Sequence, residues 1–362
     1  MNTILLSRRE ALGVLACAAL SAGARATTNA PRFITRGVVL YPWDLSLADW
    51  PQRAAKAGIT TIALHAAQRL DILLDFLKSE TGSVFLKDCR ESGVQVEYEL
   101  HAMGTLLSRE LYYSPAMKMF RLDESGKRNP DGNCCPSSPE ALTRISEKAV
   151  EYGRLLRPTT GRYFYWPDDG GKWCHCPKCK GLNAADQAVL VENAMVKALR
   201  KHLDPVATLS HIAYGKTLRP PATIKPHEAL FLEFAPISRL YDRSINDPEA
   251  MLGEQADPPS HAAYLEILDA NLEVFGKDTA QVLEYWLDVS RFSSWQRPAQ
   301  KISWLEAIVR ADADAYARRG IRHAATFATW IDADYVKRFG DPPLTEYVAA
   351  LEGTYPGKEQ NL

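Results

Sequence analysis

The sequence of 362 residues predicts an α/β protein built as a single (β/α)₈ TIM barrel. Eight short apolar or aromatic segments recur along the chain, and segments with helical spacing follow most of them. Strands that alternate with helices pair in parallel, and eight such units without a linker or low-complexity break are typical of one closed barrel. A doubly wound open sheet is the alternative, but the chain lacks the expected glycine-rich loop after the first strand and has Tyr41-Pro42-Trp43-Asp44 there.

Each predicted strand is rich in apolar, β-branched or aromatic residues, and turn-forming residues follow most of them. In order, the predicted strands are Gly37–Trp43, Thr60–His65, Gln95–His101, Tyr163–Asp169, Leu209–Gly215, Ala229–Ala235, Gln281–Asp288 and His323–Asp332. The helices are predicted from apolar residues that recur with a period near 3.6. They are Asp49–Ala57, Gln68–Leu77, Ser138–Leu156, Ala185–His202, Ala262–Phe275 and Trp304–Arg319.

Three connections are longer than the others, and they follow the third, sixth and seventh predicted strands. They are Met103–Pro136, Pro236–Pro259 and Val289–Ile302. In a barrel of this class the loops that follow strands form the catalytic face. We therefore expect a functional site at this end.

The N-terminal segment has the pattern of a twin-arginine export signal. Ser7-Arg8-Arg9 precedes an Ala/Leu-rich run and the small-x-small sequence Ala24-Arg25-Ala26. We expect residues 1–26 to be removed and 27–362 to form the catalytic domain, in the periplasm or outside the cell. A cytosolic protein with an apolar N-terminus is the alternative. No later run is long enough for a transmembrane helix, and a net charge of −1 argues against a nucleic-acid partner.

Two adjacent carboxylates, Asp168 and Asp169, follow the aromatic fourth strand. Neighbouring carboxyls cannot both ionise freely, so one can keep its proton near neutral pH and act as a general acid. The alternative is a simple turn, in which Asp168 caps the backbone and Asp169 is solvated. The position of the pair at the C-terminal end of a barrel strand favours the catalytic interpretation.

The third predicted strand alternates in polarity. Its apolar side should contact the helices, which points Glu97, Glu99 and His101 into the barrel. His101 lies nearest the mouth and is the best placed for a ligand. The two glutamates are candidates for structural residues, neutralised by Arg or Lys from neighbouring strands.

Other polar or aromatic residues lie in or near later strands and are candidates for ligand contacts. The polar candidates are His211, Tyr214, Glu233, Glu284 and Asp288. Four of the eight tryptophans, Trp43, Trp166, Trp286 and Trp330, also fall at or near strand ends. Indole faces stack on sugar rings, so tryptophans together with carboxylates indicate a carbohydrate site. The alternative is that large aromatic residues plug the top of the barrel.

The cysteines Cys174-x-Cys176-x-x-Cys179 have a spacing that can wrap a metal, and Cys135 or its neighbour Cys134 could supply a fourth thiolate. A disulfide is the alternative, because an exported protein reaches an oxidising compartment. Three or four thiolates leave no open coordination position, so we expect structural zinc or a disulfide and no cofactor for catalysis.

Several of these motifs resemble a known family. The segments Tyr98–Met103, Phe120–Asp123, Asn133–Glu140, Trp166–Asp169, Trp173–Cys179 and Phe231–Pro236 resemble the bacterial domain-of-unknown-function family numbered 4838. That family is similar to barrel glycoside hydrolases, and some members are classed as glycoside hydrolase family 163 endo-β-N-acetylglucosaminidases. The resemblance implies an enzyme that cleaves glycans containing N-acetylglucosamine.

The pair Asp168 and Asp169 also resembles the adjacent acidic pairs of barrel hexosaminidases, which implies the first of two mechanisms; the second competes with it. In the first, the acetamido group of the substrate is the nucleophile, Asp168 orients it and Asp169 protonates the glycosidic oxygen. In the second, Asp169 is the acid of a retaining glycosidase and Glu284 is a covalent nucleophile. Two other function classes remain open: a secreted barrel that binds carbohydrate without turnover, and a zinc-dependent hydrolase, for which histidines and cysteines should be mixed at catalytic spacing.

Overall fold

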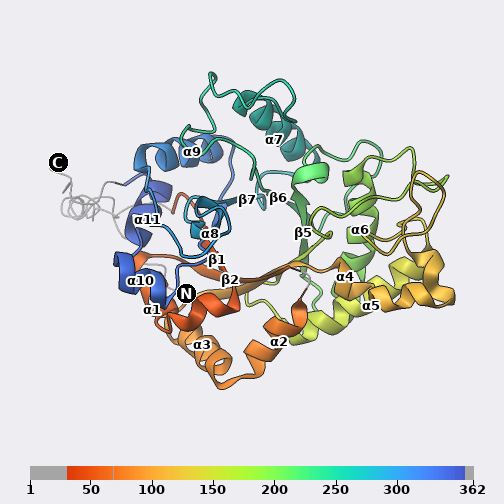
Figure 1. The fold of residues 1–362 in the computed structure, drawn as a ribbon, viewed down its shortest axis with the longest axis horizontal. Coiled ribbons are helices and arrows are strands. Elements are labelled where there is room, and N and C mark those ends of the chain that lie inside the picture. Colours follow the sequence, from red (N-terminus) through yellow and green to blue (C-terminus); the bar gives the residue numbers. More distant parts are fainter. Residues whose placement is uncertain (1–30, 68, 355–362) are drawn as a thin grey trace, which may run out of the picture. The chain divides into compact units, whose positions relative to one another are not determined.

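Eight parallel strands close into a barrel in a computed structural model that describes residues 31–67 and 69–354 (Figure 1). Consecutive strands are neighbours, and β8 pairs with β1. This confirms the predicted TIM barrel. The strands are β1 (Thr35–Leu40), β2 (Thr61–Ala67), β3 (Gln95–His101), β4 (Arg162–Trp166), β5 (Thr208–Ala213), β6 (Leu230–Phe234), β7 (Gln281–Glu284) and β8 (His323–Phe327).

Helices surround the barrel (Figure 1). They are α1 (Trp50–Ala57), α2 (Leu70–Lys78), α3 (Glu80–Glu91), α4 (Met103–Leu106), α5 (Pro139–Leu155), α6 (Ala184–His202), α7 (His261–Phe275), α8 (Val289–Phe292), α9 (Glu306–Arg318), α10 (Ala333–Phe339) and α11 (Leu344–Glu352). Short 3₁₀ turns are η1 (Pro42–Ser46), η2 (Arg109–Tyr113), η3 (Pro115–Met119) and η4 (Gly215–Thr217). Three long helices start at the N-cap side chains of Ser138, Asn183 and Ser260, which accept backbone N–H groups of the first turn.

Six strands end earlier than the sequence predicts, and β7 and β8 differ most from their predicted ends. Strand β7 stops at Glu284, because the chain turns and the Asp288 side chain caps α8. Strand β8 stops at Phe327, and Trp330 follows with a positive φ of 67° that no strand contains. Both segments are apolar enough to resemble strands, but they form the loops of the barrel mouth.

The lower interior of the barrel holds a buried polar layer. The guanidinium of Arg162 on β4 lies 3.7 Å from Oε1 of Glu97 and donates to Gln281, which in turn donates to Glu233. The predicted inward orientation of Glu97 and Glu99 is confirmed. The predicted neutralisation by a basic residue from a neighbouring strand is confirmed for Glu97, whereas Oε1 of Glu99 accepts the Gln281 amide at 3.5 Å. Burial raises the pKa of Glu233 to about 8 and that of Glu99 well above its usual value.

An apolar cluster also fills the barrel interior, and its members Trp166, Leu283, Tyr285 and Phe327 form the floor of the mouth. Its larger members are Phe164, Trp166, Phe231, Leu283, Tyr285 and Phe327. A second, larger apolar core packs the outer faces of the strands against the helices. Side chains of one strand therefore alternate between the barrel interior and the helix layer, and this alternation decides which residues can reach a ligand.

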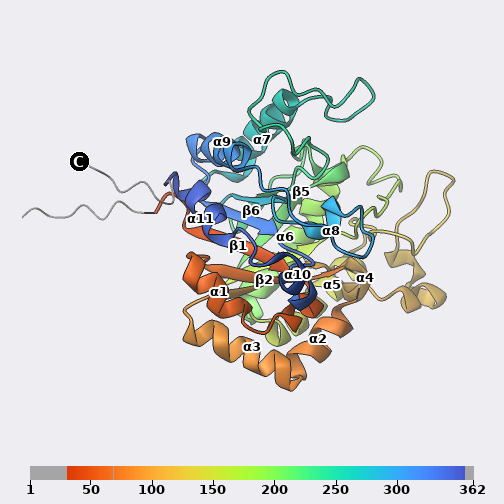
Figure 2. The ribbon, with the colours of Figure 1, turned by 60° about the vertical axis from the view of Figure 1, so that its left-hand side comes forward.

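Loops at the C-terminal ends of the strands build the mouth. Figure 2 shows the segment after β3, with α4, and the segment after β7, with α8, on the same side of the barrel. The expected export signal, residues 1–26, lies outside the described residues. None of the helices in residues 31–67 and 69–354 has the length and apolar character needed to cross a membrane.

Candidate active site

Two adjoining cavities open at the mouth of the barrel. The first has a volume of about 290 Å³ and lies over the apolar floor, and the second, about 430 Å³, extends along the loops after β4 and β5. Both are lined by His101, Asp169, Ile212, Tyr214 and Ile237. The shared residues mark the place where one cavity passes into the other.

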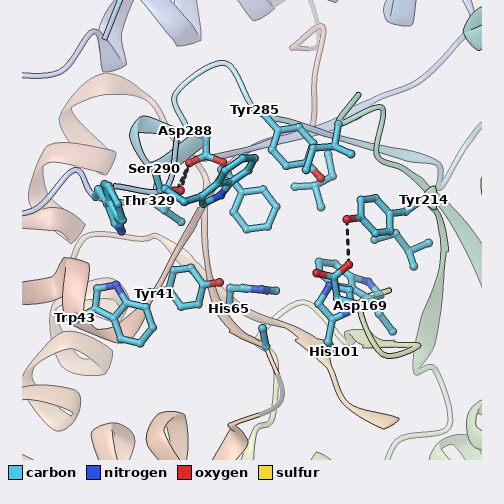
Figure 3. A pocket seen from close by; sticks show the side chains of 18 residues that line it. Tyr41, Trp43, His65, His101, Asp169, Tyr214, Tyr285, Asp288, Ser290 and Thr329 are labelled. Carbon is cyan, nitrogen blue, oxygen red and sulfur yellow. Dashed lines mark hydrogen bonds between the residues drawn. The ribbon is translucent and has the colours of Figure 1, made fainter. Parts of the chain in front are cut away.

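Asp169 lies at this junction, in the exposed turn that follows β4. The hydroxyl of Tyr214 donates a hydrogen bond of 3.1 Å to Oδ1 of Asp169 (Figure 3). Burial raises the pKa of Tyr214, and the Asp169 carboxylate raises it further, so this hydroxyl stays protonated and remains a donor. Two residues that the sequence predicts separately for the site, Asp169 and Tyr214, are thus brought together at the mouth.

Asp168 points differently from its neighbour. Its Oδ1 accepts the backbone N–H of Gly104 at 2.8 Å, and its Oδ2 forms an ion pair with Arg109. Its own backbone N–H donates to Oδ1 of Asn133. Both carboxylate oxygens therefore bind the loop after β3, although the residue still borders the second cavity.

A second carboxylate, Asp288, lines the first cavity from the loop after β7. Its Oδ1 accepts hydrogen bonds from the hydroxyls of Ser290 and Thr329 at 2.5 and 2.6 Å and from the backbone N–H of Arg291 at 3.1 Å. Figure 3 shows Asp288 and Asp169 on different sides of the cavity. Of the described residues, these are the two carboxylates that line it.

Neutral donors and acceptors lie between these carboxylates. Nδ1 of His65 donates to the Glu99 carbonyl at 2.7 Å and Nδ1 of His101 to the Pro167 carbonyl at 2.6 Å, which leaves each Nε2 as an acceptor. Burial lowers the pKa of His65 to about 3 and also lowers that of His101. Burial, with smaller contributions from nearby carboxylates, raises the pKa of Tyr41 to about 12.

Three indoles border the first cavity at its rim: Trp43, Trp295 and Trp330. Trp43 is 48% exposed and stacks on Tyr41 with ring centroids 4.3 Å apart, and Trp295 is 65% exposed. Exposed indole faces beside carboxylates and neutral histidines can stack on the C–H face of a sugar and bond its hydroxyls. The predicted positions of Trp43 and Trp330 at the mouth are confirmed.

Three predicted site residues lie behind the barrel wall and not at the mouth. Glu284 is fully buried, pairs with Arg239 at 3.2 Å and accepts the hydroxyl of Tyr316 on α9. Trp286 donates to Asp312 on α9, and His211 bonds Glu192 on α6 at 2.8 Å. All three side chains point outward to the helices, because their neighbours in sequence point into the barrel. These inward-facing neighbours are Leu283, Tyr285, Ser210 and Ile212.

Trp166 and Glu233 lie inside the barrel beneath the cavity. Nε1 of Trp166 donates to Oε2 of Glu233 at 2.7 Å and to the Ser210 hydroxyl at 3.1 Å. Trp166 borders the first cavity although only 1% of it is exposed, while Glu233 supports it from below. Glu233 does not line the cavity, which corrects the expectation that it contacts a ligand; it supports Trp166 instead.

The four predicted cysteines come together. The Sγ atoms of Cys135, Cys174, Cys176 and Cys179 lie within 4.8 Å of one another and are buried. His175 points elsewhere: its Nε2 lies 3.7 Å from an exposed Glu124 carboxylate. The cluster therefore offers four thiols with no histidine, which is the donor set of a closed structural site and not of a hydrolytic zinc with an open position.

Some cavity residues were not predicted: Tyr41, His65, Tyr285, Trp295, Phe327 and Thr329. For Tyr41 and His65 the sequence does carry a signal. Each stands at the C-terminal end of a strand, two residues after an inward-facing residue, Val39 or Ala63, and alternate residues of a strand share one face. Trp295 comes from the long loop after β7 and carries no such periodic signal.

Comparison with known proteins assigns the chain to a family. The model of the domain of unknown function DUF4838 matches residues 27–257. The chain belongs to this family. Curated protein sequences give no match.

Solved structures share the fold. A β-N-acetylhexosaminidase from Bacteroides fragilis is 11% identical with a TM-score of 0.53, and the match covers 91% of this chain and 68% of that enzyme. A GH42 β-galactosidase from G. stearothermophilus is 12% identical with a TM-score of 0.52, over 89% of this chain and 56% of that one. At these identities the likeness shows the shared (β/α)₈ barrel fold. The chain spans little more than half the length of the galactosidase.

Proposed function

We propose that the protein is a glycoside hydrolase that cleaves its substrate where the two mouth cavities meet. The position of Asp169 is the observation that supports this most strongly: the residue lines both cavities and is oriented by Tyr214. A glycosidase must protonate the oxygen that joins the two halves of its substrate. A saccharide with one unit in each cavity would place that oxygen beside Asp169.

In this proposal Asp169 is the proton donor and Asp288 is the second carboxylate. Asp288 is favoured over Glu284 because it lines the first cavity, whereas Glu284 is enclosed by Arg239 and Tyr316. The three hydrogen bonds to Oδ1 fix the Asp288 side chain in one orientation, as a catalytic carboxylate requires. The rim indoles would hold the sugar ring above the floor.

The finer proposal is that the sugar is N-acetylglucosamine and that its acetamido group is the nucleophile. It is supported by the sequence resemblance and by the fold shared with the B. fragilis β-N-acetylhexosaminidase. In that scheme Asp168 must exchange one of its bonds, to Arg109 or to the Gly104 N–H, for the acetamido group. If the acetamido group is the nucleophile, catalysis requires Asp168. If Asp288 is the second catalytic carboxylate, catalysis requires Asp288 and Asp168 can keep its bonds to the loop after β3.

A screen of aryl glycosides and N-glycans for released sugar, followed by three variants, tests the proposal. Asp169→Asn should lower kcat by about 10²–10⁴-fold, and less for substrates with a good leaving group, which need little protonation. If Asp288 is the second carboxylate, Asp288→Asn removes turnover on every substrate. If the acetamido group is the nucleophile, Asp168→Asn slows N-acetyl substrates and Asp288→Asn mainly raises KM.

The matched control is Asp341→Asn, which changes an exposed aspartate that pairs with Arg53 on α1 and lines neither cavity. It should keep the wild-type kcat. Wild-type turnover of Asp169→Asn on a verified substrate would refute the assignment. Sugar affinity without any released product would instead identify a carbohydrate-binding barrel.

A further inference from the structure

The cysteine cluster lies in the loops beside the acidic turn, apart from the two mouth cavities. Cys135 comes from the loop after β3, and Cys174, Cys176 and Cys179 come from the loop after β4. The four residues are at most 6% exposed and are all free thiols. Apart from Leu122, which packs against them, the cysteines form an apolar cluster of their own.

We propose that Cys135, Cys174, Cys176 and Cys179 bind one structural zinc ion that ties the loop after β3 to the loop after β4. Zinc–thiolate bonds of about 2.3 Å in a tetrahedron require sulfur atoms roughly 3.8 Å apart. The Sγ atoms of Cys135 and Cys176 are 3.8 Å apart, and all four lie within 4.8 Å of one another. Four convergent sulfurs at this spacing match one tetrahedral ion, and a cluster of several irons would hold them farther apart.

Hydrogen-bond donors surround the sulfurs in the way that thiolate ligands require. The backbone N–H of Leu122 donates to Sγ of Cys174 at 3.3 Å. The Ser137 hydroxyl lies 3.2 Å from Sγ of Cys135 and 3.3 Å from Sγ of Cys176. Groups that donate to metal-bound sulfur orient the ligands and offset their charge.

The surrounding backbone is also fixed. The side-chain amide of Gln187 on α6 accepts the Cys174 N–H at 3.0 Å and donates to the Cys174 carbonyl at 3.2 Å. The Asn133 N–H donates to the Lys172 carbonyl at 3.1 Å, which joins the same two loops beside the cluster. The site therefore combines a preorganised backbone with four donor atoms, and it lies next in sequence to the turn that carries Asp168 and Asp169.

A disulfide is the competing occupant of this cluster. One disulfide would join two of the sulfurs and leave the other two as buried thiols, and two disulfides would require two two-electron oxidations. The zinc ion uses all four. It also requires no oxidant, because each thiol releases a proton when it binds the metal.

Metal analysis of the purified full-length chain, expressed with zinc available, tests the proposal. The expected result is one zinc per chain, with six alkylatable thiols after unfolding in chelator among the described cysteines, Cys89 and Cys134 included. Cobalt added to the chelator-treated and reduced protein should give the intense visible bands of a tetrahedral thiolate site. A mass that shows a disulfide within the cluster, or iron or no metal in the wild-type protein, would overturn the proposal.

Variants locate the ion. Cys176→Ser should lower the zinc content and the melting temperature, whereas Cys176→His, which keeps a zinc ligand, should retain most of the metal. Cys134→Ser is the matched control, because Cys134 is also buried and precedes the ligand Cys135 in sequence but lies outside the cluster. Loss of zinc in Cys134→Ser as complete as in Cys176→Ser would contradict the ligand assignment. The outcome is independent of glycosidase activity, because every readout is metal content, thiol state or stability.

Discussion

Replacing Glu284 by Gln separates a structural carboxylate from a catalytic nucleophile. In the structure Glu284 accepts the Tyr316 hydroxyl at 2.5 Å and lies 3.2 Å from Arg239, whose guanidinium is fully buried. Arg239 keeps a second partner, Asp312, at 2.6 Å. The substitution therefore removes one of two negative charges around a buried cation and keeps the shape of the side chain.

The expected cost is about 3 kcal/mol of folding free energy. Breaking a buried ion pair costs about 3–5 kcal/mol, and the remaining Asp312 carboxylate places Glu284→Gln at the lower end. With about 2 °C of melting temperature per kcal/mol, as for larger domains, the melting temperature should fall by roughly 6 °C. Because Glu284 does not line the cavity, kcat at 25 °C should stay within a few-fold of the wild type.

The assay is a thermal melt followed by circular dichroism, paired with kcat on a verified aryl glycoside well below the transition. Asp169→Asn is the reciprocal control: its side chain is exposed at the mouth, so it should keep the melting temperature and lose turnover. Near-complete loss of turnover in Glu284→Gln with an unchanged melting temperature would refute this reasoning and restore Glu284 as a nucleophile.

Three further predictions concern other parts of the chain. Burial lowers the pKa of His65 to about 3, so protons favour the unfolded state once the pH falls below the unfolded pKa of 6.5. Between pH 8 and pH 5 the free energy of unfolding, measured with urea, should fall by about 2 kcal/mol more for the wild type than for His65→Gln. An equal fall in the two proteins would contradict this. Trp43→Ala should raise KM by roughly 2–10-fold with kcat and melting temperature nearly unchanged, because the indole is half exposed at the rim; an unchanged KM would remove it from the sugar site. Mass spectrometry of the protein from its native host should find a chain that begins near Thr27, and recovery of intact Met1 from the cytosol would reject export.

The fold could be predicted because two periodicities alternate along the sequence. The helices α5, α6 and α7 begin close to their predicted first residues, since Ser138, Asn183 and Ser260 supply N-caps just before apolar residues of helical spacing. The sequence carries a weaker signal for the ends of the strands. The run that follows β7 is apolar enough to continue a strand, and only the cap that Asp288 provides for α8 shows where pairing stops.

The facing of side chains could be predicted for β3 but not for β5 or β7. In β3, charged and apolar residues alternate, so Glu97, Glu99 and His101 could be assigned to the interior. In β7 each side carries one polar and one apolar residue: Gln281 and Leu283 point inward, and Val282 and Glu284 point to the helix layer. Without alternation, a polar residue such as Glu284 has no sequence signal for its face, and an error of one position moves it from the mouth to the helix layer.

The acidic pair shows a different limit of sequence reasoning, and it changes the chemistry. Asp168 and Asp169 are adjacent, but the first binds Arg109, which lies far away in sequence, while the second faces the cavities. The positive charge of Arg109 offsets the negative charge of Asp168. Repulsion between Asp168 and Asp169 therefore no longer explains how one of the two carboxyls would keep a proton. In the mechanism proposed above, the bound sugar must supply that condition by displacing water from the junction of the two cavities, because loss of water disfavours the charged form of a carboxyl. In that mechanism, proton donation by Asp169 would therefore require a substrate long enough to cover both sides of the residue.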